Sequence, residues 1–182
     1  MTDLRRAARA DVAALERLIH RSIVELLGPQ LGADELPLWL AHVFGVDTQL
    51  IDDGTYYVIE GDAADGGGLI AAAGGWGGRA TLYGGDARKG GEVAPRLDPA
   101  RDAARIRAFY VDPAHVRRGL GSRILVHVEA EARAAGFRRV ELLATPTGIP
   151  LYARHGYVEF AREAVTLPNG RSYDWPRMEK VF

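Results

Sequence analysis

The chain has no cysteine, and lysine is almost as scarce: Lys89 and Lys180 are the only two among its 182 residues. The lack of cysteine excludes disulfide bonds, cysteine nucleophiles and thiolate metal sites, and it is typical of a cytoplasmic protein. Arginine, alanine and glycine are abundant instead, a bias that we interpret as that of a GC-rich, bacterial genome. We therefore expect a cytoplasmic protein and draw no functional conclusion from the basic residues.

A strong net charge and long apolar runs are also missing. The formal net charge of −1 argues against a nucleic-acid or membrane-surface partner, since such proteins usually carry a basic excess. No apolar run approaches the roughly 20 residues that span a bilayer, and the charged N-terminal segment does not look like a secretory signal. The length and the hydrophobic fraction of 47% predict one globular domain over residues 1–182.

The hydrophobic periodicity predicts elements in the order β, α, α, β, β, β, α, β, α, β, β. Helices are expected over 12–26, 34–45, 121–135 and 148–156, with Asp11 as the cap of the first. Strands are expected over 3–6, 55–61, 68–76, 104–113, 137–145, 157–167 and 171–182, with a loose turn at 62–67 and a tight one at Asn169-Gly170. This order predicts an α/β (α+β) fold: a mixed sheet of about seven strands, one right-handed β-α-β crossover and about four flanking helices.

The segment 74–99 is rich in glycine, aspartate and arginine. It fits either a surface connection without special role or a mobile loop beside an active site. The second interpretation is favoured by Trp76, Arg79 and Tyr83, which are costly residues to leave in solvent.

The stretch "HVRRGLGSRIL", residues 115–125, follows a strand and opens a helix. Glycines at such a junction let backbone N–H groups and the positive helix end converge on a phosphate. A Walker A loop requires a lysine that is absent here, and a dinucleotide fingerprint requires a small residue where Ile124 stands. A coenzyme A site is the remaining possibility.

With "LYARHGYVEF" downstream, "VDPAHVRRGLGSRIL" resembles the GCN5-related N-acetyltransferase (GNAT) superfamily, whose signature is [QR]-x-x-G-x-[GA]; Val116 departs from its first position. The resemblance implies that the ends of the fourth and fifth strands splay and that acetyl-CoA binds between them as cosubstrate. Coenzyme-binding residues implied by the family are Phe109, Tyr110 and Val111 for the pantetheine arm and Arg117, Arg118, Gly119, Leu120, Gly121 and Ser122 for the pyrophosphate. Thr145 and Thr147 stand where relatives often place an asparagine near the pantetheine.

The resemblance also implies that Tyr152 is the general acid or a hydrogen-bond donor to the departing sulfur, although packing of a short helix would explain it as well. A general base is not identified: Glu60, Asp102 and Glu141 fit solvated surface charges as well as a base, and a water relay is equally compatible. The five histidines are not spaced as metal ligands, so no metal is expected.

Substrate-binding candidates come from side-chain chemistry alone. Arg107 and Arg79 are able to clamp a carboxylate, with Arg107 expected on the same strand face as Phe109, although surface ion pairs would also explain both. Trp76 is either packed in the sheet or in contact with the ligand.

Together, the residues and the family resemblance predict an N-acetyltransferase that moves an acetyl group from acetyl-CoA to a small-molecule amine. A homodimer is compatible with this prediction. The alternatives are a non-catalytic acyl-CoA sensor and a protein N-terminal or lysine acetyltransferase.

Overall fold

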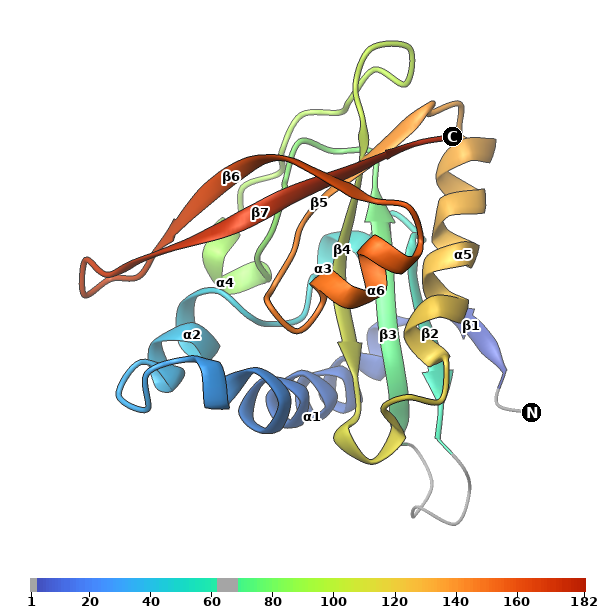
Figure 1. Cartoon of the computed structure of the whole chain (residues 1–182). Helices are drawn as coiled ribbons and strands as arrows, with labels where there is room; N and C mark the ends of the chain where they lie inside the picture. The colour runs from blue at the N-terminus through green and yellow to red at the C-terminus, as the bar shows by residue number, and fades with distance from the viewer. Residues whose placement is uncertain (1–2, 62–68) are drawn as a thin grey trace.

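A computed structural model describes residues 3–61 and 69–182. These residues form a seven-stranded sheet in the order β1-β2-β3-β4-β5-β7-β6 (Figure 1). The strands are β1 Leu4–Arg6, β2 Tyr56–Glu60, β3 Ile70–Gly77, β4 Ala104–Val111, β5 Arg139–Leu143, β6 Val158–Thr166 and β7 Ser172–Val181. Neighbours are antiparallel except β4 and β5, which are parallel. The predicted mixed sheet is confirmed, whereas the predicted turn at 62–67 lies outside the described residues.

The described helices are α1 Val12–Ser22, α2 Leu36–His42, α3 Thr48–Asp52, α4 Asp86–Lys89, α5 Leu120–Ala134 and α6 Ile149–Arg154. The short helices α3 and α4 were not predicted, because four or five residues are too few to reveal a 3.6-residue period. Helix α1 continues as a π-helical turn, Ile23–Leu27, which the periodicity did not reveal either. None of the described helices has the length and apolar character that crossing a membrane requires.

The predicted cap of the first helix is wrong in detail. Asp11 precedes α1, yet its carboxylate makes no capping bond to that helix. It instead accepts the N–H of Ala8 at 2.7 Å and two hydrogen bonds from Arg5 at 2.8 and 2.9 Å. The nearby guanidinium therefore competes successfully for the oxygens that a cap would use.

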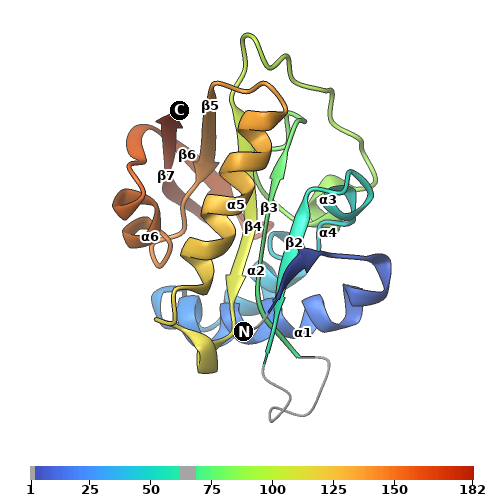
Figure 2. The same ribbon diagram turned by 90° about the vertical axis from the view of Figure 1, so that its right-hand side faces the viewer.

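Two hydrophobic cores lie on opposite faces of the sheet. Successive residues of β2 alternate between them: Tyr56 and Val58 pack with α1–α3, whereas Tyr57 and Ile59 pack with α5. Figure 2 shows α5 lying along its face of the sheet. The closing hairpin β6–β7 is confirmed, and the Arg171 guanidinium fastens its tip to the carboxylate of Glu35 at 2.8 Å.

A β-bulge in the middle of β4 overturns one prediction. The register against β3 shifts between Ala73 and Gly75, and Ala108 has a φ of 59°. The extra residue reverses the alternation, so Phe109 packs with the α5 core while Arg107 faces the opposite side of the sheet, toward Asp47. Arg107 and Phe109 therefore do not share a face, contrary to the prediction from simple alternation.

Candidate active site

The two central strands separate at the level of this bulge. Pairing between β4 and β5 ends after Ala104–Val140 and Arg105–Glu141, so the rest of the β4 edge has no neighbouring strand on that side (Figure 1). A cavity of about 540 Å³ occupies the resulting gap. The splay that the family resemblance implied is thus present.

One half of the cavity, which we call the loop end, is built around the start of α5. Its lining includes Phe109–Val111, Arg117 and Gly119–Ser122. Both Arg117 and Gly119 have left-handed backbones, with φ of 63° and 78°. The first intrahelical bond of α5 runs from the N–H of Arg123 to the carbonyl of Gly119, so the preceding N–H groups have no intrahelical acceptor. The loop end therefore combines backbone donors with a positive helix end, the arrangement that binds phosphate.

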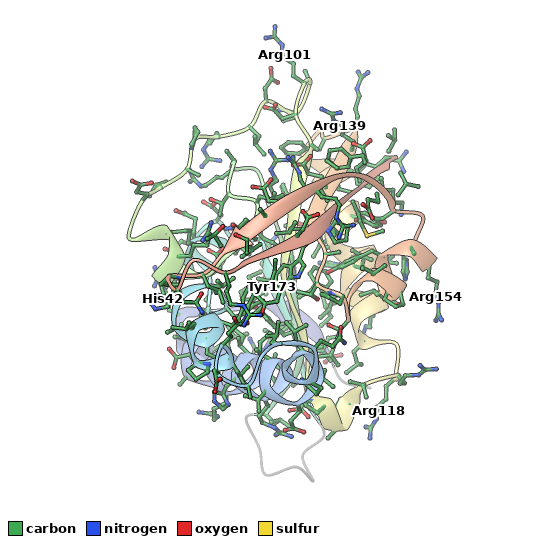
Figure 3. The ribbon with its side chains drawn as sticks, turned by 60° about the vertical axis from the view of Figure 1, so that its left-hand side comes forward. His42, Arg101, Arg118, Arg139, Arg154 and Tyr173 are labelled. Carbon is green, nitrogen blue, oxygen red and sulfur yellow. The ribbon has the colours of Figure 1, made fainter. Side chains whose placement is uncertain are left out.

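The close approach of a ligand to this loop depends on the small size of its glycines. A Cβ atom added at Gly121 would lie 3.3 Å from Leu151 on α6 and 3.7 Å from Val111 on β4, within the mouth of the gap. Of the predicted phosphate contacts, Arg118 is not part of the lining, and its side chain extends outward from the molecule (Figure 3). The residues present fit a pyrophosphate held mainly by backbone groups.

Helix α6 brings Tyr152 to the same gap. The Tyr152 ring packs edge-on against Phe109 at a centroid distance of 6.2 Å and against Tyr157 at 5.7 Å. Burial raises the pKa of the Tyr152 hydroxyl above its usual value, so this hydroxyl stays protonated at neutral pH and is able to donate. A hydrogen bond of 2.9 Å between His155 Nε2 and Ser122 Oγ joins α6 to the start of α5.

The other half, which we call the acceptor end, lies across β4 from the loop end. Its walls are apolar and aromatic and come from segments far apart in the chain: Ile23, Leu26, Leu27, Val43, Phe44, Leu82, Tyr83 and Trp175. The indole of Trp175 stacks on that of Trp39 at 4.8 Å and is fixed in the core. The glycine-rich segment therefore contributes to the cavity, through Leu82, Tyr83 and Gly84.

The glycine-rich segment is held against the fold by close backbone contacts. The N–H of Gly85 donates to the carbonyl of Val43 at 3.1 Å, and that of Asp86 donates to Val46 at 3.0 Å. A Cβ at Gly85 would lie 2.7 Å from the backbone of Gly45, so only glycine permits this approach. This contact explains how a segment of low complexity forms a defined cavity wall.

Arg107 is the charged side chain of the acceptor end. Its guanidinium is 5% exposed and pairs through Nη2 with the buried carboxylate of Asp47. Burial lowers its pKa, and Asp47 opposes that shift. Lys89 of α4 also reaches Asp47, with Nζ 2.5 Å from Oδ1.

The other predicted substrate-binding residues lie outside the cavity lining. Trp76 is buried and packs edge-on against Phe137 at 6.0 Å, on the α5 side of the sheet. Arg79 makes a bidentate pair with Asp53, at 2.8 and 3.0 Å. Packing and ion pairing therefore account for both side chains.

The base candidates are likewise elsewhere. Glu60 pairs with Arg5 at 2.8 Å, Asp102 accepts the N–H of Asp98 at 2.7 Å, and Glu141 is buried between Arg105 and Arg177. Among residues 3–61 and 69–182, no aspartate or glutamate lines the cavity. The same part of the chain contains no group of three histidines or carboxylates that could hold a metal ion.

Sequence patterns did not reveal most of the acceptor end. Leu26, Phe44 and Trp175 have the hydrophobicity of ordinary core residues, and nothing local distinguishes residues that line a cavity from residues that fill one. Thr145 and Thr147 do line the cavity, at the end of β5. Two signals did point to the acceptor end: the glycine-rich segment 74–99 with Tyr83, and Arg107 as a side chain able to bind a carboxylate.

Comparison with known proteins agrees with this geometry. Residues 21–157 match the Acetyltransferase (GNAT) family, so the chain belongs to that family. Comparison with curated protein sequences gives no significant match.

Solved structures with the same fold include a GCN5-related N-acetyltransferase from Rhodopseudomonas palustris, with 18% identity, a TM-score of 0.69 and coverage of 100% of this chain and 96% of that one. The PaiA N-acetyltransferase from Thermoplasma acidophilum, in complex with coenzyme A, has 10% identity, a TM-score of 0.67 and coverage of 100% and 99%. A GNAT family acetyltransferase from Brucella melitensis, in complex with acetyl-CoA, has 14% identity, a TM-score of 0.57 and coverage of 100% and 88%. At these identities the structures establish a shared fold.

Proposed function

We propose that this acetyltransferase moves an acetyl group from acetyl-CoA to the amine of a small molecule. The observation that carries the proposal is the single cavity that joins a phosphate-binding loop end to a walled acceptor end across the β4–β5 gap. The two complexes named above support coenzyme A as the group held at the loop end. Acetyl-CoA supplies the activated acyl carbon, and this chain's residues bind, orient and assist.

The residues at the loop end have separate tasks. The N–H groups of Leu120, Gly121 and Ser122 hold the pyrophosphate, and the unpaired β4 edge from Phe109 to Val111 holds the pantetheine arm. Arg117 lines the same end and adds positive charge at the rim.

Tyr152 assists the departure of the sulfur. The amine nitrogen bonds to the acyl carbon, the carbon–sulfur bond breaks, and the sulfur leaves with the electron pair. A buried phenol whose pKa is raised above 10 is a weaker acid than a thiol with a pKa of about 8.5, so complete proton transfer to the sulfur is uphill. Tyr152 therefore acts as a hydrogen-bond donor to the developing thiolate. The nitrogen loses its second proton as the amide forms, and this proton reaches the sulfur through solvent.

The proton on the amine has to leave before attack. An alkylammonium of pKa about 10.4 costs roughly 4–5 kcal/mol to deprotonate at pH 7. Since no carboxylate of the described residues lines the cavity, we assign this step to water and not to a side-chain base.

The walls of the acceptor end favour a small molecule over a protein substrate. Residues 82–84 of the glycine-rich segment and Trp175 of the closing hairpin both line it. An extended peptide would need these two segments to be apart. A cytoplasmic location and a homodimer stay predictions of the sequence.

Two measurements test the proposal. Acetyl-CoA at 100 times its dissociation constant should stabilise the fold by about 2.7 kcal/mol, measured by thermal or chemical unfolding. Thiol release from acetyl-CoA should depend on an added small amine. Stabilisation without thiol release from any amine or peptide would establish the sensor instead, and turnover confined to peptides would establish a protein acetyltransferase.

A further inference from the structure

The acceptor end holds buried hydrogen-bond donors that the fold itself does not use. Nε and Nη1 of Arg107 are buried and have no hydrogen-bond partner among the described residues, while Nη2 pairs with Asp47. Arg107 is part of the cavity lining, and only 5% of its side chain is exposed. Buried N–H groups of this kind are rarely left without an acceptor, so a ligand oxygen is the expected partner.

The hydrogen-bonding geometry of Arg107 favours a carboxylate. Asp47 is 1% exposed and is shared between Arg107 and Lys89, so the buried members of this cluster carry two positive charges and one negative. The next carboxylate, Asp86, lies 3.0 Å from Lys89 Nζ and is 44% exposed. Asp86 therefore offsets the charge of Lys89, and what Arg107 lacks is an acceptor for Nε and Nη1. A ligand carboxylate has two oxygens that are able to accept from both.

The remainder of the acceptor end fits an apolar group. Leu26, Phe44, Tyr83 and Trp175 present hydrocarbon and ring surfaces. Because no aspartate or glutamate among the described residues lines the cavity, a second ammonium group would have no anion to meet there. This composition disfavours polyamines and aminoglycosides.

We propose that the acceptor is an amino acid with an apolar side chain, whose carboxylate binds Arg107 and whose side chain lies between Phe44 and Trp175. The inference rests on the proposed function and specifies its substrate class. Acetylation then forms the N-acetyl amino acid.

The test compares matched pairs of acceptors in a thiol-release assay. Phenylalanine is set against 2-phenylethylamine, and leucine against 3-methylbutylamine, so that each pair differs only in the carboxylate. We expect kcat/KM to be roughly 10- to 100-fold higher for the amino acid of each pair, the range of a charge-assisted hydrogen bond. Spermidine and kanamycin serve as polycationic acceptors and should be the poorest.

Two variants test whether Arg107 causes the preference for acceptors that carry a carboxylate. Arg107→Gln should reduce the ratio of kcat/KM between phenylalanine and 2-phenylethylamine toward one, while acetyl-CoA still stabilises the protein. The matched control is Arg105→Gln, an ion-paired arginine on the same strand and face that does not line the cavity, and it should keep the ratio. If Arg107→Gln fails to fold, the wild-type pairs decide alone.

Equal or better turnover of the decarboxylated amines, or of spermidine or kanamycin, overturns this inference and leaves the acetyltransferase function standing. Absence of turnover with every amine overturns the proposed function, and the inference falls with it.

Discussion

The two ends of the cavity are built in different ways. The loop end comes from two short stretches, 109–122 and 145–154, and presents backbone groups positioned by a bulge, two left-handed residues and a helix start. The acceptor end comes from five stretches far apart in the chain and presents side chains instead of backbone groups. They are the π-helical turn after α1, residues 43–44, residues 82–84, Arg107 of β4 and Trp175 of β7.

This difference separates the recognition of the cosubstrate from the recognition of the acceptor. Backbone donors recognise a phosphate in the same way whatever the neighbouring side chains are, so the loop end suits a common cosubstrate. A pocket made of side chains changes with each substitution, so the acceptor end carries the specificity. Variants at the two ends should therefore affect coenzyme and acceptor separately.

The largest effect is expected at Gly121. Gly121→Glu places bulk and negative charge where the pyrophosphate would lie, 3.3 Å from Leu151, and should abolish the stabilisation by acetyl-CoA in a thermal-shift measurement. The matched control, Val126→Glu, adds the same charge to a site on α5 that is 55% exposed and should keep the shift. An unchanged shift in Gly121→Glu would move the coenzyme to another place.

Tyr152 lines the cavity and is proposed to assist only the departing sulfur, so its substitution should affect turnover and neither binding step. Tyr152→Phe removes one hydrogen bond to the developing thiolate, and kcat should fall roughly 10- to 100-fold while acetyl-CoA binding is retained. The control is Tyr157→Phe, the neighbouring buried tyrosine that does not line the cavity. Equal losses in the two variants would indicate that Tyr152 acts only through packing.

Substitution of Tyr83 tests whether the acceptor end binds its ligand independently of the coenzyme. Tyr83→Ala removes half-buried ring surface from the cavity wall and should raise the acceptor KM about tenfold, because burial of this area stabilises a ligand by 1–2 kcal/mol. Acetyl-CoA affinity should not change. A parallel loss of coenzyme binding would show that the two ends are coupled and would refute the separation drawn above.

The smallest effect concerns the ion pair between Arg79 of the glycine-rich segment and Asp53. Hydrogen bonds from Arg79 lower the pKa of Asp53 below its usual 3.8. The folded-state pKa is therefore below the unfolded one, so the pair stabilises the fold above pH 3.8, and this contribution is lost as the pH falls through the folded value.

Asp53→Asn should accordingly cost about 1 kcal/mol at pH 7 and much less near pH 3, measured by urea unfolding at both values. Asp98→Asn, in an exposed pair with Arg101 (Figure 3), should cost less at either pH. A cost for Asp53→Asn that does not depend on pH would contradict the ion-pair account.

Most of the fold followed from periodicity, because strands and long helices bury alternating or 3.6-spaced residues. Elements shorter than two turns escaped, as α3 and α4 did. The bulge at Ala108 also escaped, and with it the true direction of Arg107, because a positive φ at alanine has no sequence signature. The sequence predicted that Arg79 and Arg107 bind one carboxylate together. In the structure they form separate ion pairs instead, Arg79 with Asp53 and Arg107 with Asp47.

By itself, the sequence determined the class of protein and the loop end, because glycines at a strand–helix junction restrict the backbone locally and leave a recognisable spacing. Only the tertiary structure decided the acceptor end. There, Asp47, Lys89 and Arg107 meet from three separate segments, and the unsatisfied donors of Arg107 arise from that meeting. A binding preference that depends on which charges are buried together is not present in any one stretch of residues, so it emerges only when the chain is folded.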